Sequence, residues 1–198
     1  MTRNKKLYAV TGGIGSGKSA VCSIIAQENY PVVSCDEVYA RLTRGGNMVK
    51  KLEDAFGGVT LPDGSLDRHV LSKRVFGDKT ALEKLNCITH GEIMRELFRQ
   101  AEEAEGNIVF CEVPLLFENR FEKNFDGVLV VTRPLEQRIA AVMERNGLSR
   151  DEVTARIAAQ YDYDGNSFTQ YYVLCNDGNL QELYKKVKKI LQKINKLT

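Results

Sequence analysis

The segment GGIGSGKS at residues 12–19 constrains the fold of this chain more than any other stretch, because it fills every fixed position of G-x-x-x-x-G-K-[ST]. The apolar run Leu7–Thr11 before it predicts a buried strand. After it, apolar residues recur at helical spacing from Lys18 to Gln27. A chance glycine-rich turn would not account for this strand and helix, so the segment indicates a phosphate-binding loop.

Each residue type of the loop has its own task at the phosphates of a nucleotide. Glycines let backbone N–H groups approach the phosphate oxygens, and the helix that follows adds the positive end of its dipole. Lys18 supplies a mobile charge for the β- and γ-phosphates, and the Ser19 hydroxyl can bind Mg²⁺. We predict Mg²⁺ as the cofactor and an ATP site that includes Gly13, Ile14, Gly15, Ser16, Gly17, Lys18, Ser19 and Ala20.

The order of the apolar runs predicts an α/β fold of the P-loop NTPase type, with three α/β/α layers around a parallel sheet. After the first strand, further strands are predicted at Val32–Ser34, Asn107–Val113, Gly127–Thr132 and Tyr171–Cys175. Helices are predicted at Val49–Phe56, Arg68–Phe76, Lys79–Ala104, Leu135–Arg145, Arg150–Gln160 and Leu180–Leu197.

We expect a single domain over residues 1–198, because no repeat or low-complexity linker divides the chain. Its core is expected at about 1–45, 105–135 and 168–198. A helical substrate lobe is expected at about 46–104 and a helical lid at about 136–167.

Composition and charge narrow the class of partner. The net charge is +2, from 28 basic and 26 acidic residues. So small an excess of basic residues does not favour nucleic acid as the binding partner. No apolar run reaches the ~20 residues that span a bilayer, so we expect no membrane partner. The five cysteines are widely spaced and never form C-x-x-C, which argues against disulfides or zinc and for a reducing cytoplasm. We expect a cytoplasmic monomer.

Phosphate loops serve GTPase switches, ATP-driven motors and small-molecule kinases. Guanine specificity usually comes with Asn-Lys-x-Asp after a strand, whereas the last predicted strand leads into Asn176-Asp177-Gly178. Motors usually carry an apolar strand that ends in adjacent acids, and Ile108–Glu112 ends in only one, which is ambiguous. The small size and the helical inserts favour a kinase.

A kinase needs a base near the acceptor hydroxyl and cations around the transferred phosphate. Asp36 follows the second strand, and ligands gather at the carboxyl ends of parallel strands, so it is a candidate base. Its alternative role is the N-cap of a helix that starts at Glu37. Arginines of the predicted lid suggest clamps as a group, although the solvated surface is the more common role for each one alone: Arg138, Arg145, Arg150 and Arg156.

Further motifs follow along the chain in a fixed order. They are Thr11–Ser19, Ser34–Asp36, Gly64–Arg68, Val75-Phe76, Leu85-Asn86, His90, Val113–Glu118, Arg145–Ser149, Arg156, Gln160 and Asn176–Gly178. In this order, and over nearly the whole chain, they resemble the dephospho-coenzyme A kinase family. Convergence on so many separated motifs is not expected.

The resemblance implies transfer of the γ-phosphoryl group of ATP to the ribose 3′-hydroxyl of dephospho-coenzyme A, the last step of coenzyme A synthesis (EC 2.7.1.24). It implies Asp36 as the base, Lys18 at the β- and γ-oxygens, and Arg145 as a lid clamp that also belongs to the ATP site, with Arg138 as its possible partner. The candidates for the acceptor site are Asp36, Asp67, Arg68, His90, Pro114, Leu115 and Glu118.

These acceptor candidates have structural alternatives. Asp67-Arg68 also fits a helix cap with an adjacent charge, His90 fits a hydrogen-bonded structural histidine, and Pro114–Phe117 fits packing. The chain departs from the family at four positions, which are Ser34, Gly91, Ala141 and Tyr171. Two other functions stay open: another P-loop kinase for a nucleotide or metabolite, and a nucleotide-binding module without catalysis.

Overall fold

The computed structural model describes residues 5–196, which fall into two compact units. The first unit comprises the described residues up to Val32 together with those from Ala104 onwards. The second unit is Val33–Glu103. This division places residues 33–45 with the helical lobe, whereas the sequence predicts a lobe that begins near residue 46. None of the helices within residues 5–196 combines the length and the apolar character that crossing a bilayer requires.

A five-stranded sheet forms in the order β2-β3-β1-β4-β5. The strand β1 pairs in parallel with β3 and with β4, and β4 pairs in parallel with β5. The apolar runs therefore build the parallel sheet that the sequence predicts. The strands are β1 Lys6–Thr11, β2 Val32–Ser34, β3 Ile108–Glu112, β4 Gly127–Thr132 and β5 Tyr172–Cys175.

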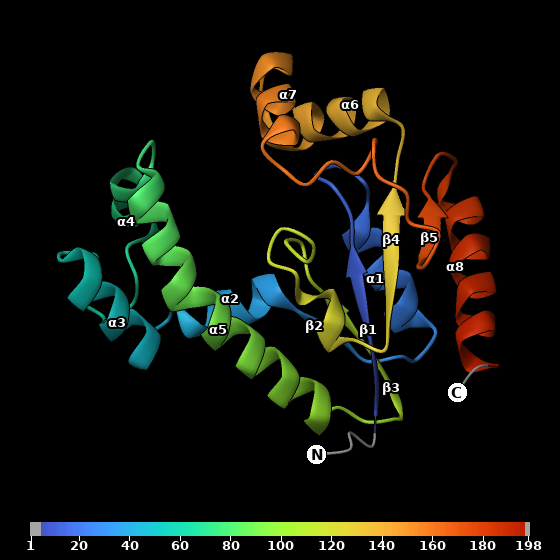
Figure 1. The fold of residues 1–198 in the computed structure, drawn as a ribbon, viewed down its shortest axis with the longest axis horizontal. Helices are drawn as coiled ribbons and strands as arrows, with labels where there is room; N and C mark the ends of the chain where they lie inside the picture. Colours follow the sequence, from blue (N-terminus) through green and yellow to red (C-terminus); the bar gives the residue numbers. More distant parts are fainter. Residues whose placement is uncertain (1–4, 197–198) are drawn as a thin grey trace. The chain divides into compact units, whose positions relative to one another are not determined.

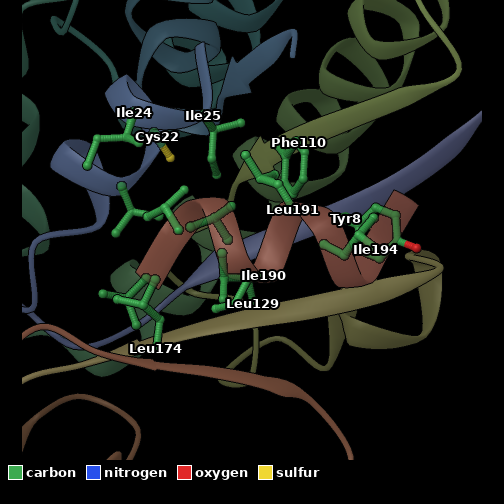
Figure 2. Close-up of a cluster of buried hydrophobic side chains, with 14 of the residues drawn as sticks. Tyr8, Cys22, Ile24, Ile25, Phe110, Leu129, Leu174, Ile190, Leu191 and Ile194 are labelled. Carbon is green, nitrogen blue, oxygen red and sulfur yellow. The ribbon is translucent and has the colours of Figure 1, made fainter. Parts of the chain in front are cut away.

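The helices α1 (Lys18–Gln27) and α8 (Leu180–Asn195) pack side by side and bury their apolar faces on the sheet (Figure 1). In α8 the buried residues recur three or four positions apart, which is one face of a helix. The predicted end of this helix, Leu197, lies outside the described residues. The core between helices and sheet, shown in Figure 2, includes Tyr8, Ile25, Phe110, Leu129, Leu174, Leu191 and Ile194.

The predicted lid contains a pair of helices, α6 (Leu135–Asn146) and α7 (Arg150–Ala158), which lies beyond the end of β4 in Figure 1. Gly147 ends α6 in the left-handed conformation, with φ 64°. A capping box of Ser149 and Glu152 starts α7. The two helices share a small core, called the lid cluster below, whose buried members are Ile139, Val142 and Val153.

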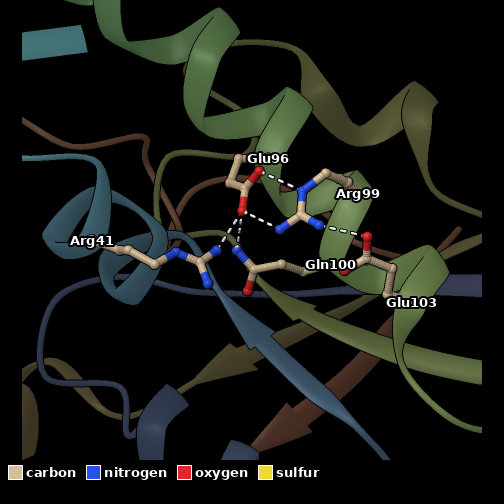
Figure 3. A network of polar contacts seen from close by, with 5 residues as sticks. All are labelled: Arg41, Glu96, Arg99, Gln100 and Glu103. Atoms are coloured by element: carbon tan, nitrogen blue, oxygen red, sulfur yellow. Dashed lines mark hydrogen bonds and ion pairs between the residues drawn. The ribbon is translucent and has the colours of Figure 1, made fainter. Parts of the chain in front are cut away.

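The second unit contains four helices: α2 Cys35–Leu42, α3 Asn47–Phe56, α4 Arg68–Val75 and α5 Lys79–Glu103. Its own core includes Met48, Leu52, Val59, Leu66 and Leu71. A polar network ties α2 to α5, because Glu96 accepts from both Arg41 and Arg99 (Figure 3). In the first unit a short 3-10 helix, η1 (Phe121–Asn124), forms where the sequence predicts no element.

Candidate active site

The phosphate loop connects β1 to α1, and its glycines are required by close neighbours as well as by backbone conformation. Gly15 and Gly17 are both left-handed, with φ 77° and 94°. A Cβ at Gly15 would lie 2.6 Å from the carbonyl oxygen of Arg138 in α6. A Cβ at Gly17 would collide with the side-chain amide of Asn176, which itself donates to the carbonyl oxygen of Ser16 at 3.0 Å. The loop is therefore enclosed by the lid and by the residue that follows β5.

Lys18 is the first residue of α1, and the N-cap, Gly17, makes no side-chain capping bond. The start of this ten-residue helix is therefore suited to an anion. Lys18 Nζ donates to the carbonyl oxygens of Gly12 at 2.6 Å and Gly13 at 3.2 Å, so its charge lies over the loop. Ala20, in the first turn of α1, packs against the core of the first unit.

Two of the loop amides have partners within the protein. The N–H of Ile14 donates to Gln160 Oε1 at 2.7 Å, and the N–H of Ser16 donates to the carbonyl oxygen of Gly13 at 3.2 Å. The Ser16 hydroxyl is a buried polar atom with no hydrogen-bond partner. A buried hydroxyl without a partner is costly unless a ligand satisfies it, so this atom fits a loop built for a polar ligand.

Glu112 is a candidate site residue that sequence reasoning did not assign. It ends β3 opposite Val10 of β1, and the alternation of the strand puts its side chain on the same face as Phe110, the face that α1 covers. The Ser19 hydroxyl donates to Glu112 Oε1 at 3.2 Å, and Glu112 is only 9% exposed. A hydroxyl and a carboxylate at the carboxyl end of a strand are the oxygen ligands that hold Mg²⁺ in P-loop proteins. The residues present therefore fit Mg²⁺.

Of the four lid arginines, Arg138 differs from the rest. It is 3% exposed, and its Nε donates to the carbonyl oxygen of Ile14 at 3.1 Å. Its Nη1 lies 3.0 Å from Asp164 Oδ2. The guanidinium of Arg138 is therefore held between the loop and Asp164, and its joining Arg145 as a clamp over the transferred phosphate stays a prediction.

The other lid arginines lie on the surface. Arg145 is exposed in the last turn of α6, and its Nε donates to Asn146 Oδ1 at 2.8 Å. Arg150 pairs with Glu136 of α6 at 2.6 Å, and this partner raises the pKa of its guanidinium. Arg156 is exposed in the last turn of α7.

Five aromatic rings join the segment after β3 to the segment after α7. The ring of Phe117 lies at their centre, with ring centroids 5.0–6.0 Å from each of the others. The Tyr163 hydroxyl lies 3.0 Å from Thr11 Oγ1, directly before the loop, and burial raises the pKa of Tyr163 to about 12. The other members are Tyr161, Phe168 and Tyr171.

The acceptor candidates after β3 belong to the same unit as the loop. Pro114 is half-buried and Leu115 is 42% exposed. The next residue, Leu116, is fully buried. Glu118 Oε1 accepts the N–H of Tyr161 at 3.0 Å. Leu116 therefore packs as a core residue, and Glu118 ties this segment to the end of the lid.

Asp36 lies in the second unit, in the first turn of α2. This helix begins at Cys35 with Ser34 as its N-cap, two residues before the start that the sequence predicts. The alternative in which Asp36 is the N-cap is therefore wrong. The side chain of Asp36 is exposed.

Asp67, Arg68 and His90 also belong to the second unit. Asp67 is the N-cap of α4 and accepts from the N–H groups of His69 and Val70, both at 3.0 Å. It therefore has the helix-cap role that the sequence offers as the alternative to substrate binding. The Arg68 guanidinium donates to Thr43 Oγ1 at 2.6 Å and lies over the Tyr39 ring, 5.0 Å from its centroid. His90 is half-buried in the middle of α5.

Comparisons with known proteins identify the family of the chain. The description of the family "Dephospho-CoA kinase" matches residues 7–182. A dephospho-CoA kinase of Thermus thermophilus is 37% identical over 188 residues, which cover 95% of this chain and 91% of that protein. A crystal structure of a Thermus thermophilus protein superposes with a TM-score of 0.83 at 37% identity and covers 96% of this chain and 98% of that one.

A shikimate kinase of Bacteroides thetaiotaomicron shares the fold, with a TM-score of 0.53 at 14% identity over 96% of this chain and 98% of that one. The fold of this chain is thus shared with a kinase of low sequence identity. The match over residues 7–182 is specific, and the chain belongs to the dephospho-CoA kinase family, the enzymes of the final step of coenzyme A biosynthesis.

Proposed function

We propose that this chain transfers the γ-phosphoryl group of ATP to the 3′-hydroxyl of dephospho-coenzyme A through the residues described here. The acceptor oxygen forms the new bond to phosphorus, the bond to the β-phosphate oxygen breaks, and ADP, coenzyme A and a proton leave. The observation that carries the proposal is the contact between Ser19 and Glu112 beside Lys18, at the helix start of a complete phosphate loop.

The phosphate loop binds the donor. The amides at the start of α1 and Lys18 Nζ bind the β- and γ-oxygens, so Lys18 exchanges the carbonyl oxygens of Gly12 and Gly13 for phosphate. Ser19 and Glu112 are the residues that would hold Mg²⁺ or its water ligands. When bound, Mg²⁺ neutralises charge on the phosphate oxygens.

Asp36 is the proposed base. It follows β2 directly, its side chain is exposed, and the N-cap role belongs to Ser34. A carboxylate in this position accepts or orients the proton of the acceptor hydroxyl, which contributes about 10²–10⁴-fold to such reactions. By resemblance, Ser34–Asp36 corresponds to the family motif Asp-x-Asp. Ser34 replaces the first acid of that motif, and Asp36 keeps the second.

Arg145 is the proposed clamp of the lid. Its guanidinium is exposed at the end of α6, so it is available to the charge that spreads over the γ-phosphoryl group in a loose transition state. Arg68 is the proposed anion contact of the acceptor lobe, because Thr43 and the Tyr39 ring orient its guanidinium. His90, Pro114, Leu115 and Glu118 stay candidates for the acceptor's surroundings. We further propose that the protein acts in the cytoplasm as a monomer.

Two other functions are open to the same test. A different P-loop kinase would phosphorylate a nucleotide or a metabolite, and a module without catalysis would bind ATP only. The experiment measures ADP release with Mg²⁺-ATP and one acceptor at a time: dephospho-coenzyme A, AMP, CMP, adenosine or none. Mass spectrometry identifies the product. Turnover with dephospho-coenzyme A alone, with a product one phosphate heavier, supports the proposal, and turnover with another acceptor or with none overturns it.

A further inference from the structure

Ile14, within the phosphate loop, is bound to the lid through its backbone donor, its backbone acceptor and its side chain. Its N–H donates to Gln160 Oε1 at 2.7 Å, and its carbonyl oxygen accepts from Arg138 Nε at 3.1 Å. Its side chain packs against the lid cluster. The loop and the lid are therefore joined at one residue by three separate contacts.

Arg138 provides the charged part of this junction. Its guanidinium is enclosed on both sides, because Nε donates to Ile14 while Nη1 donates to both carboxylate oxygens of Asp164, at 3.2 and 3.0 Å. The same group also lies close behind the loop, since a Cβ at Gly13 would be 2.5 Å from Nη2. One planar group thus spans the phosphate loop and the segment after α7, a geometry that the fixed fork of arginine allows.

Asp164 is itself held by the turn through which the chain leaves the lid. Asp162 Oδ1 accepts the N–H of Asp164 at 3.1 Å and the N–H of Gly165 at 2.8 Å. The carboxylate of Asp164 is 52% exposed, whereas Arg138 is 3% exposed. The buried cation of the pair therefore depends on a half-exposed partner in the turn that follows α7.

We propose that Arg138 is a positioning residue for the phosphate loop, and that its ion pair with Asp164 couples the loop to the position of the lid. The pair keeps the Ile14 carbonyl turned toward α6, so that the loop is ordered before ATP arrives. This inference rests on the proposed use of ATP and goes beyond it, because neither residue has a part in the mechanism given above.

The expected effect follows from the burial of Arg138. If Asp164 is replaced by asparagine, the buried Arg138 guanidinium keeps the Ile14 carbonyl and one amide oxygen as acceptors but loses its counter-charge, and a buried charge without a counter-charge is unfavourable. The loop is then less ordered, and part of the binding energy of ATP goes into ordering it. ATP affinity should fall, whereas the overall fold should keep its stability because Asp164 is half exposed.

The experiment compares Asp164→Asn with Asp164→Glu, which keeps the charge, and with Asp151→Asn, an exposed aspartate in the first turn of α7. Calorimetry measures the Kd of ATP, steady-state kinetics separates KM for ATP from kcat, and thermal melting without nucleotide reports stability. Asp164→Asn should raise the Kd and KM for ATP about tenfold. Asp164→Glu and Asp151→Asn should stay within about twofold of the unchanged protein.

Arg138→Met provides a second route to the same contact. Where it folds, its effect on ATP affinity should not add to that of Asp164→Asn, because both changes break one interaction. Asp164→Asn with an unchanged Kd for ATP overturns the inference. The inference is also overturned if Asp164→Glu, which keeps the charge, loses as much ATP affinity as Asp164→Asn and melts more than about 5 °C below the unchanged protein. The role of Asp164 would then be structural. Failure of the unchanged protein to bind ATP would overturn the proposed function itself.

Discussion

The Ser19 hydroxyl donates to Glu112 Oε1 at 3.2 Å, which joins the first turn of α1 to the end of β3 across 93 positions of sequence. Ser19 comes from the phosphate loop motif, whereas Glu112 ends an apolar strand with a single acid. The sheet pairs β3 with β1 and so brings that acid beside the loop.

Glu112→Gln should lower kcat about 10²-fold, because the neutral amide keeps the shape of the side chain but loses the charge that favours a cation near Ser19. The measurement is turnover as a function of Mg²⁺ concentration, which should shift to higher Mg²⁺ in the variant. Glu105→Gln, an exposed change before β3, is the matched control. Equal turnover and equal Mg²⁺ dependence in Glu112→Gln and the control would remove Glu112 from the site.

Lys18→Ala should abolish activity and leave the fold intact. The ammonium donates to the carbonyl oxygens of Gly12 and Gly13 in its own loop, and Lys18 does not belong to the buried core. Turnover and the circular dichroism melting curve are measured side by side, with Lys185→Ala of α8 as the control. If Lys18→Ala kept more than about a tenth of the turnover, the assigned role at the phosphates would be wrong.

Asp36→Asn should bind ATP normally and turn over at least about 10²-fold more slowly, because the amide cannot accept the proton of the acceptor hydroxyl. Binding is measured by calorimetry and turnover by ADP release. Glu37→Gln, an exposed acid in the same first turn of α2, serves as the control for a change of charge at the helix start. Near-normal turnover of Asp36→Asn would assign the base to another residue.

Glu96→Gln should change the pH dependence of stability. The Arg99 guanidinium that donates to Glu96 lowers the pKa of this carboxyl to about 2, from an ordinary value of 4.5. A lowered pKa means that the charged form is favoured in the folded state. Its stabilising effect is therefore complete above the unfolded pKa of 4.5 and disappears as the pH falls toward 2.

The free energy of unfolding, measured with urea, should be about 1 kcal/mol smaller for Glu96→Gln at neutral pH, because the arginines that face Glu96 are half exposed. The two curves should converge as the pH falls through the range from 4.5 to about 2. Glu83→Gln, an exposed residue of the same helix, should show no such convergence. Parallel curves for Glu96→Gln would mean that the network in Figure 3 does not stabilise the second unit through this charge.

Much of the fold could be predicted from the sequence, because apolar runs bounded by turn residues set the strands directly. The strands at Val32–Ser34 and Gly127–Thr132 have the predicted bounds, and so does the helix Lys18–Gln27. The helix α2 begins two residues before the predicted start. Ser34 caps it without a side-chain hydrogen bond, and the acids that follow, Asp36 and Glu37, also fit a helix start.

The site was harder to predict, because its other residues come from distant segments. Glu112 carried a signal, a single acid at the end of an apolar strand, which could have identified it once β3 was known to pair with β1. Gln160 appeared only as part of a family motif, and its bond to Ile14 depends on the path of the chain after α7. The burial of Arg138 has no local signal, since the spacing of a helix does not tell which arginine lies under a neighbouring loop.

The three contacts of Ile14 mean that the lid is not a transferable module. A chimaera that takes its lid helices from another kinase of this fold would leave Ile14 facing foreign side chains, with its N–H and carbonyl no longer matched to Gln160 and Arg138. Redesign of acceptor specificity by exchanging lids would therefore have to exchange the middle of the phosphate loop as well. In this chain the phosphate loop and the lid would have to be redesigned together.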